Sequence, residues 1–183
     1  MMGCKIERSG SIGIYTYSVA PDWASRPVNY VSWYDCLRFC NWLHNGQPIG
    51  VQDATTTEDG AYDMSLGASV VRKPGARVWL PSENEWYKAA YHKNDGVTGN
   101  YFDYPTSSDT EPGIDLNEGT NPGNNANHTY NLGTYVIGPP YYRTPIGEFE
   151  LSVSPYGTFD QGGNISEWVE TPLFDYPSYR GTH

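Results

Sequence analysis

A short segment near the C-terminus, residues 156–168, places the strongest constraint on how this chain can fold. It reads Tyr-Gly-Thr-Phe-Asp-Gln-Gly-Gly-Asn-Ile-Ser-Glu-Trp, with three glycines and two carboxylates. Glycine permits bulges and a close approach of the backbone, so the segment favours a bend over a long regular element. Asp160, Glu167 and the backbone carbonyls released by a bend are the hard oxygen donors that Ca²⁺ prefers. The segment therefore predicts a bend braced by a metal ion.

The rest of the chain is also rich in turn-forming and aromatic residues. Among its 183 residues are 20 glycines and 14 prolines, and aromatic residues make up 15% against 17% charged residues. This composition predicts a single loop-rich domain whose large, rigid side chains suit an irregular core or a binding surface. A formal charge of −10, with eleven dispersed basic residues, leaves no basic stripe, so we expect no nucleic-acid partner.

Membrane and redox signals are weak throughout the sequence. No stretch approaches the roughly twenty apolar residues of a membrane span, and the N-terminus lacks the apolar run of a signal peptide. We therefore expect a soluble chain without a membrane span, and the compartment is left open. The cysteines are Cys4, Cys36 and Cys40. The last two are four residues apart, which places them on one helix face rather than in a zinc spacing, and we expect buried apolar filler.

Two segments carry the signals of a helix start. Ser32 is a suitable N-cap with Asp35 three residues later, and the Asn-Gly pair at 45–46 is expected to end this first helix. Ser82 and Glu85 form a capping box at the start of a second helix. The apolar faces expected to be buried are Cys36, Leu37, Phe39, Cys40 and Leu43 in the first helix and Trp86, Ala89 and Ala90 in the second.

The remaining segments predict short strands and long loops. Strands are expected at residues 15–19, 61–64, 77–80, 143–149 and 168–169. Residues 46–76 are predicted to be a surface excursion, and residues 97–140 an ordered meander rich in Gly, Asn and Tyr. The tyrosines of residues 101–142 suit two roles, a contact surface for a ligand or a small core of the loops themselves.

Four motifs in series resemble the formylglycine-generating enzyme family, also called sulfatase-modifying factors. They are Pro-Val-Asn-Tyr-Val-Ser-Trp at 27–33, Trp-Leu-Pro-Ser-Glu-Asn-Glu-Trp at 79–86, Thr-Pro-Ile-Gly at 144–147 and the segment at 156–168. The resemblance implies an α+β, C-type-lectin-like fold with two helices, small antiparallel sheets and much irregular loop. Residues 1–25 are then expected to be a shortened lead-in, and residues 26–183 the sulfatase-modifying-factor-like domain, without its C-terminal cysteine-bearing segment.

The resemblance also implies a structural calcium site. The family's ligand positions fall on Asp160, Gly163, Ile165 and Glu167. Gly163 and Ile165 would contribute backbone carbonyls, while Asp160 and Glu167 would supply the negative charge. The alternative is that Glu167 faces solvent and that the glycines only shape a turn.

A second calcium site of the family would fall on Asn127 and His128 and on positions near Gly138 and Pro140, where the family usually offers an acidic residue. This sequence offers none there, so a cation would have only neutral donors, and we expect His128 to be an ordinary surface histidine. The triplets at 127–129 and 164–166 also match N-glycosylation acceptors, which matters only in a secretory eukaryotic context.

The resemblance implies a chemistry for which this sequence lacks residues. Enzymatic family members oxidise a sulfatase cysteine to formylglycine with molecular oxygen and a copper ion held by two cysteines, and soft thiolates suit cuprous copper. That cysteine pair follows an Arg-Gly-Gly-Ser turn, whereas this sequence ends in Tyr-Arg-Gly-Thr-His at 179–183. None of the three cysteines matches the motif. We therefore expect no catalytic residues and a catalytically incompetent domain, with copper bound only if a further segment supplies the pair.

The alternative function is a calcium-braced, lectin-like module that binds a ligand or a protein. Loops rich in Tyr, Asn and Gly present rigid aromatic area and adaptable hydrogen bonds on such a scaffold, and the fold alone does not decide between the two. The expected partners are a sulfatase-like polypeptide or another protein ligand. A homo-oligomer is a further expectation, because exposed strand edges favour pairing between copies.

Overall fold

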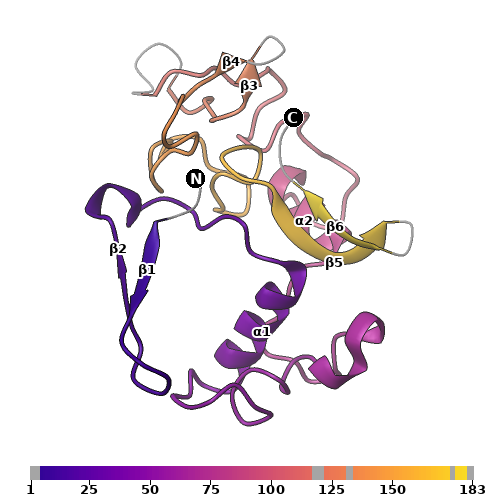
Figure 1. The fold of residues 1–183 in the computed structure, drawn as a ribbon. Coiled ribbons are helices and arrows are strands. Elements are labelled where there is room, and N and C mark those ends of the chain that lie inside the picture. The colour runs from indigo at the N-terminus through magenta and orange to yellow at the C-terminus, as the bar shows by residue number, and fades with distance from the viewer. Residues whose placement is uncertain (1–4, 117–121, 131–133, 174–175, 181–183) are drawn as a thin grey trace.

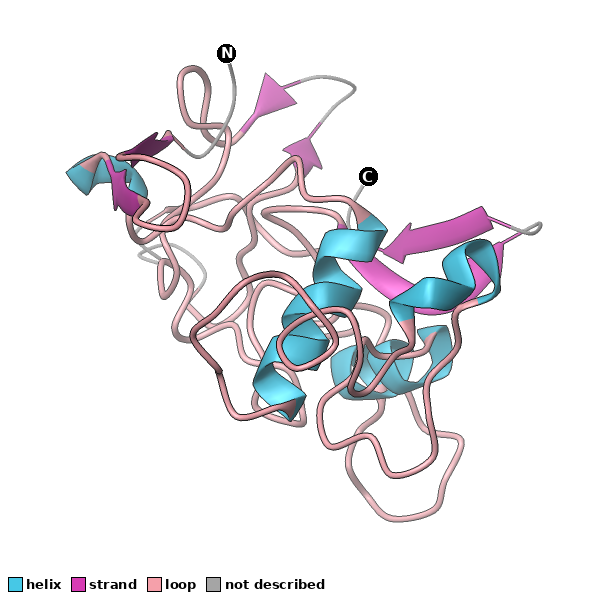
Figure 2. Ribbon diagram, turned by 60° about the horizontal axis from the view of Figure 1, so that its bottom comes forward, coloured by secondary structure: helices cyan, strands magenta, loops and turns pink. Residues whose placement is uncertain are grey.

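The structure is a computed structural model that describes residues 5–116, 122–130, 134–173 and 176–180. This part of the chain has an α+β fold in which long loops connect two helices and three two-stranded antiparallel sheets (Figures 1 and 2). In chain order the elements are β1 (Ile6–Ser9), β2 (Thr16–Val19), a 3₁₀ turn (Pro21–Trp23), α1 (Trp33–His44), a 3₁₀ segment (Met64–Ser69), α2 (Glu83–Tyr91), β3 (Thr129–Tyr130), β4 (Thr134–Tyr135), β5 (Glu167–Leu173) and β6 (Tyr176–Arg180). The expected α+β class is confirmed at this level.

Helix α1 begins and ends where the sequence predicts. Ser32 Oγ accepts a hydrogen bond from Asp35 N at 3.2 Å, and Asp35 Oδ2 accepts one from Ser32 N at 2.9 Å. The helix stops at His44, and Asn45 follows as the C-cap. Its buried residues are Trp33, Leu37, Cys40 and Asn41. The prediction is wrong for Phe39, which is 57% exposed because it lies two residues, or about 200°, from Leu37 around the helix.

Helix α2 also has its predicted start. Ser82 Oγ accepts from Glu85 N at 3.2 Å, and Ser82 N donates to Glu85 Oε2 at 2.7 Å, so the capping box is confirmed. Trp86 and Ala90 are buried on one face, whereas Ala89 is half-buried. These two buried side chains pack against Val169 of β5, and this small core joins the helix to the C-terminal sheet.

The strand predictions succeed at two places and fail at three. The strands expected at 15–19 and 168–169 correspond to β2 and β5. At 61–64 there is only an isolated bridge between Tyr62 and Arg72, and the segments at 77–80 and 143–149 form no strand. Their backbone groups find partners elsewhere: Leu80 N donates to Tyr62 Oη at 3.0 Å, and Ile146 N donates to Ser25 O at 2.7 Å.

Buried hydrogen bonds of one side chain, Asn41, join α1 to the following loop. The side chain of Asn41 is fully buried, its Nδ2 donates to Thr57 O at 2.8 Å and to Tyr62 O at 2.9 Å, and its Oδ1 accepts from Tyr62 N at 2.8 Å. Around it lies the main hydrophobic core, formed by Trp33, Leu37, Cys40, Ala61, Tyr62, Met64 and Val70. The second half of the predicted surface loop at 46–76 therefore packs into the hydrophobic core.

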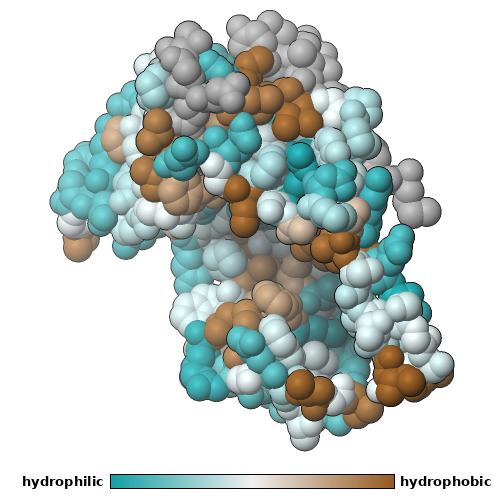
Figure 3. All heavy atoms as spheres, turned by 90° about the vertical axis from the view of Figure 1, so that its left-hand side faces the viewer, coloured by the Kyte–Doolittle hydropathy of each residue, from teal (hydrophilic) through white to brown (hydrophobic). Residues whose placement is uncertain are grey.

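The hairpin of β1 and β2 stands apart from both cores. All eight of its strand residues are exposed, and Figure 1 shows it extending beside the rest of the molecule. Figure 3 views the side that carries this hairpin, where hydrophobic side chains are scattered among polar ones around a hollow. Among the described residues, no helix is long and apolar enough to cross a membrane.

Candidate calcium and ligand sites

Residues 156–168 form the irregular bend that their sequence predicts. Asp160 and Asn164 adopt left-handed backbone conformations, with φ of 58° and 64°. Gly163 is buried against the 127 segment, and a Cβ at this position would lie 2.8 Å from Asn127 O. Only glycine therefore permits this close approach. Ile165 N donates to Gly163 O at 2.7 Å, which tightens the bend just before β5.

Asp160 and Glu167 lie together on the wall of a cavity of about 470 Å³. Burial raises the pKa of Asp160 above its ordinary value, and a hydrogen bond from Asn164 partly opposes this. Burial likewise raises the pKa of Glu167, and the nearby charge of Asp160 raises it further. The described lining contains no lysine or arginine. Two desolvated carboxylates without a basic neighbour form a donor set that is compatible with a cation.

The indole of Trp86 orients one of these carboxylates. Trp86 Nε1 donates to Glu167 Oε2 at 2.6 Å, which opposes the upward shift of the Glu167 pKa. Gln161 Nε2 donates a second hydrogen bond, to Trp86 O at 3.4 Å. The bend is therefore joined to α2 through both the side chain and the backbone of Trp86. No local pattern in the sequence marks Trp86 as a site residue. Its position in the second motif was the available signal, but its partner lies 81 residues away.

The four expected calcium ligands are only partly gathered in one place. Asp160, Ile165 and Glu167 line the same cavity, whereas Gly163 lies outside the lining. Glu167 is half-buried, and Trp86 Nε1 donates a hydrogen bond to one of its carboxylate oxygens. No group of three or more His, Cys, Asp or Glu side chains suited to a metal occurs in the described part of the chain. A cation here would depend on two carboxylates together with backbone oxygens.

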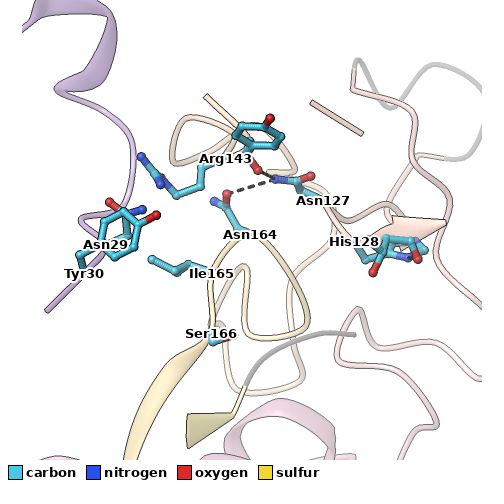
Figure 4. Close-up of a pocket in the computed structure, with 10 residues that line it drawn as sticks. Asn29, Tyr30, Asn127, His128, Arg143, Asn164, Ile165 and Ser166 are labelled. Carbon is cyan, nitrogen blue, oxygen red and sulfur yellow. Dashed lines mark hydrogen bonds between the residues drawn. The ribbon is translucent and has the colours of Figure 1, made fainter. Parts of the chain in front are cut away.

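The region expected for a second calcium ion is a neighbouring cavity of about 380 Å³, which shares Asn164 and Ile165 with the first (Figure 4). Asn127 and His128 line it, while Gly138 and Pro140 are exposed and outside its lining. No carboxylate is among the described lining residues, and the guanidinium-bearing Arg143 is. These residues do not fit a divalent cation. His128 is half-buried, with Nε2 3.1 Å from Pro112 O, so it is not an ordinary surface histidine.

The two glycosylation triplets also meet at this cavity, and their amides are occupied. Asn127 is 7% exposed, and its Nδ2 donates to Tyr142 O at 3.2 Å and to Asn164 Oδ1 at 3.3 Å. Asn164 Oδ1 also accepts from Thr144 N at 2.9 Å. In the folded state these side chains are fastened to the backbone of 142–144, which leaves the amide nitrogens poorly placed to accept a glycan.

A third cavity, of about 470 Å³, lies between α2 and the loop that follows it. Its aromatic side comprises Trp86, Tyr87, Tyr91 and Tyr104, and its acidic residues are Glu83, Asp103 and Glu111. Tyr87 packs against Tyr91 and Tyr101 with ring centroids 4.8 Å and 5.2 Å apart. Among the tyrosines of 101–142, Tyr101 packs on another ring and Tyr104 lines this cavity, so the role as a ligand surface stays a prediction.

Burial keeps the two described thiols in the protonated form. Cys36 and Cys40 lie one turn apart on α1, half-buried and 7% exposed respectively, so the expectation of buried filler is confirmed for Cys40. Burial raises the pKa of Cys36 and raises that of Cys40 to about 11. A thiol must lose its proton to bind copper, and burial makes that loss more costly for both groups. Cys4 lies outside the described residues.

The comparisons with known proteins bear on the motif series. Residues 2–180 match the family described as the sulfatase-modifying factor enzyme 1-like domain. Comparison with curated proteins and with solved structures gives no significant match. The family match extends over almost the whole chain, and it covers each of the four motifs that carry the resemblance. On this ground the chain belongs to the family of sulfatase-modifying factor enzyme 1-like domains.

Proposed function

We propose that this sulfatase-modifying-factor-like domain serves as a calcium-braced binding module and does not itself oxidise cysteine. The observation that carries the proposal is the pair Asp160 and Glu167, two partly buried carboxylates on one cavity wall whose described lining has no lysine or arginine. Ionising such a pair is costly unless a cation neutralises it. The C-type-lectin-like arrangement implied by the resemblance is part of the same proposal.

In this proposal the ion would be held by Asp160, Glu167 and the backbone carbonyls of Gly163 and Ile165. A bound Ca²⁺ supplies two positive charges and accepts six to eight oxygen ligands, so it offsets the burial of both carboxylates. Trp86 Nε1 holds one oxygen of Glu167 and leaves the other for the ion. The bend would then be joined firmly to the start of β5 and to α2.

The catalytic part of the proposal rests on the described thiols. The family's chemistry requires two thiolates, and burial keeps Cys36 and Cys40 in the thiol form. Their positions on α1 also match no cysteine of the family's copper motif. A sulfatase-like polypeptide would then be bound as a ligand and not converted.

The aromatic cavity beside α2 is the surface that best suits such a ligand. Tyr87 and Tyr104 provide rigid rings, while Glu83, Asp103 and Glu111 make its edge negative. A lysine or arginine side chain of a polypeptide matches this combination, because cations are attracted both to ring faces and to carboxylates. The net charge of −10 favours the approach of basic segments.

Two measurements on one protein sample test the proposed function. A thermal unfolding curve in CaCl₂ and in EDTA is expected to show a higher midpoint with calcium. A peptide-oxidation assay with copper and a cysteine-containing sulfatase peptide is expected to give no formylglycine. Copper-dependent product would overturn the binding-module proposal, and identical unfolding curves would overturn the calcium brace.

A homo-oligomer is the second part of the proposal, and the β1–β2 hairpin supports it. Ile6 and Tyr17 are 53% and 67% exposed, and an isolated two-stranded hairpin is only marginally stable in water. A second copy that covers these side chains would stabilise the hairpin and its open edges. Sedimentation velocity is expected to detect a dimer that Tyr17→Lys dissociates. A monomer at all protein concentrations would refute this.

A further inference from the structure

The aromatic cavity beside α2 differs in chemistry between its inner part and its edge. The inner part is aromatic: Trp86 is 7% exposed, and Tyr91 and Tyr104 are half-buried. At the edge, Asp103 and Glu111 are exposed. The described lining contains no lysine or arginine. A cationic group that enters the cavity therefore meets aromatic rings inside, while the carboxylates attract it from the edge.

The carboxylates of this cavity do not form a metal site. Glu83 is half-buried in the first turn of α2, whereas Asp103 and Glu111 belong to the loop that follows the helix. The described part of the chain contains no group of three His, Cys, Asp or Glu side chains that could hold a metal ion. Negative charge spread in this way around about 470 Å³ favours a large organic cation over a compact metal ion.

Ring contacts and a backbone hydrogen bond hold the aromatic walls in place. Tyr91 packs against Trp86 and Tyr87, with ring centroids 6.2 Å and 4.8 Å away. Phe102 N donates to Tyr91 O at 2.8 Å, which joins the loop that carries Tyr104 to the end of α2. The rings are therefore ordered before a ligand binds, so that binding costs little side-chain entropy.

The neutral amide and the imidazole of the lining are already engaged. Gln161 Nε2 donates to Trp86 O at 3.4 Å, and Gln161 Oε1 accepts from Thr158 Oγ1. His128 Nε2 lies 3.1 Å from Pro112 O. These side chains leave little hydrogen-bonding capacity for the three N–H donors of an unmodified ammonium group. Methyl groups in place of those donors need no acceptor.

We propose that the aromatic cavity beside α2 binds a methylated ammonium group, such as the side chain of trimethyllysine or the head group of choline. A trimethylammonium group keeps its positive charge and packs its methyl groups on aromatic rings. The volume of about 470 Å³ holds this group together with part of the chain that carries it. Within the proposed binding function, on which this inference rests, the ligand is thereby narrowed from basic side chains in general to methylated ones.

Four small probes test the chemistry of the ligand. N-acetyl-trimethyllysine amide is compared with N-acetyl-lysine amide, and choline with its neutral isostere 3,3-dimethylbutan-1-ol. Each is titrated into the wild-type protein by isothermal titration calorimetry in constant CaCl₂ at pH 8, where an ordinary imidazole is uncharged. The trimethyllysine amide should bind at least about fivefold tighter than the lysine amide, and choline at least about fivefold tighter than the alcohol. The methyl proton resonances of the bound cations should shift upfield, because these groups lie over aromatic rings.

The outcomes distinguish this inference from the proposed function. Equal or tighter binding of the lysine amide would overturn the preference for a methylated group and leave the binding module standing. Equal binding of choline and the alcohol would overturn the cationic ligand. Absence of saturable binding by all four probes would overturn the inference together with the ligand surface of the proposed function. Among supporting results, tighter binding of the trimethyllysine amide than of choline assigns the group to a polypeptide, and the reverse assigns it to a free small molecule.

Variants place the ligand in this cavity. Tyr104→Leu removes a ring from the lining and should weaken binding of the trimethyllysine amide about fivefold or more, whereas Tyr104→Phe keeps the ring and should retain binding. Tyr30→Leu is the matched control, because Tyr30 is 74% exposed and lies outside this lining. Asp103→Asn should weaken binding and reduce its dependence on salt. Glu7→Gln makes the same charge change on exposed β1 and should leave binding unchanged.

Melting curves by circular dichroism establish that each variant is folded. If Tyr104→Leu fails to fold, Tyr87→Leu takes its place, since Tyr87 lines the same cavity and is 46% exposed. Binding at wild-type strength in folded Tyr104→Leu or Tyr87→Leu would overturn the assignment to this cavity. An equal loss of binding in Tyr30→Leu would overturn it as well.

Discussion

Trp86 Nε1 on α2 donates a hydrogen bond of 2.6 Å to Glu167 Oε2 at the start of β5, across 81 positions of sequence. This contact places a carboxylate at the end of the bend and gives it a neutral donor inside a buried site. It also joins the helix begun by the second motif to the segment that forms the fourth. One hydrogen bond thus connects the second motif, at 79–86, with the fourth, at 156–168.

Replacing Trp86 by Phe should therefore destabilise the domain and weaken calcium binding. A hydrogen bond to a charged group contributes about 1.5–3 kcal/mol, and the smaller ring also leaves space in the core of Trp86, Ala90 and Val169. Urea unfolding in CaCl₂ measures the loss. Trp42→Phe is the matched control, because Trp42 Nε1 donates to the neutral Pro48 O at 3.1 Å and should contribute about 1 kcal/mol. Equal losses would argue against a special role for the Glu167 contact.

Glu167→Gln should abolish the stabilisation by calcium. For the wild type, calcium at a hundred times its dissociation constant would add about 2.7 kcal/mol to the free energy of unfolding. The variant removes one ligand charge, so its unfolding curves in CaCl₂ and EDTA should coincide. Glu150→Gln is the control, because Glu150 lines the same cavity but is exposed. A full calcium effect in Glu167→Gln, or its loss in Glu150→Gln, would place the ion elsewhere.

Asn41→Ala should be among the most destabilising single substitutions on α1. The change leaves Thr57 O and the backbone of Tyr62 without their buried partner, at a cost of about 2–4 kcal/mol. Asn84→Ala, on the exposed face of α2, should change stability by no more than about 0.5 kcal/mol. Chemical denaturation of both variants measures the difference. A mild effect at Asn41 would mean that the loop relaxes and recovers its hydrogen bonds with water.

The thiols of α1 should react slowly while the domain is folded. With a pKa of about 11, Cys40 at pH 8 is about one part in a thousand thiolate, and it is also inaccessible. Iodoacetamide labelling followed by mass spectrometry should modify Cys36 before Cys40, and both should react rapidly in urea. Fast labelling of Cys40 in the native protein would show that this thiol is accessible and that its pKa is not raised.

Stability should fall as the solution is acidified through the pKa of Glu58. Arg38 Nε donates to Glu58 Oε1 at 2.7 Å, and this hydrogen bond lowers the pKa of Glu58 below its ordinary value of 4.5. A carboxyl with a lowered folded-state pKa stabilises the fold above its unfolded pKa, and this contribution is lost as pH falls through the folded value. The pair should contribute about 1 kcal/mol at pH 6. Urea unfolding from pH 6 to pH 3 measures it.

Glu58→Gln isolates that contribution. The variant should be less stable than the wild type at pH 6, and the difference should shrink as the pH falls through the lowered pKa of Glu58, because the wild-type carboxyl then becomes protonated as well. Asp63→Asn serves as the control, since Asp63 accepts hydrogen bonds only from Ser65 and has no basic partner among the contacts of the described residues. If the stability difference for Glu58→Gln did not depend on pH, the contribution of the Arg38–Glu58 pair to the free energy of unfolding would come from packing rather than from charge.

Features that depend on neighbours a few residues apart could be predicted from the sequence. Ser32 with Asp35 and Ser82 with Glu85 define the two helix starts, because each capping box closes within three residues. The bend at 156–168 follows from its glycines for the same reason, and the family follows from the order of the motifs. The loop-rich character is a consequence of the composition, and the α+β class follows from the family resemblance.

Features that depend on distant partners were decided by the tertiary structure. The segment at 143–149 reads as a strand, yet Ile146 N bonds to Ser25 O and Thr144 N to Asn164 Oδ1, so no ladder forms. Likewise, Arg143 reads as an ordinary basic residue until the fold buries it against the ring of Trp23. Local spacing gives every backbone donor several candidate acceptors. Packing selects one, because a buried polar group must find a partner or lose its free energy of solvation.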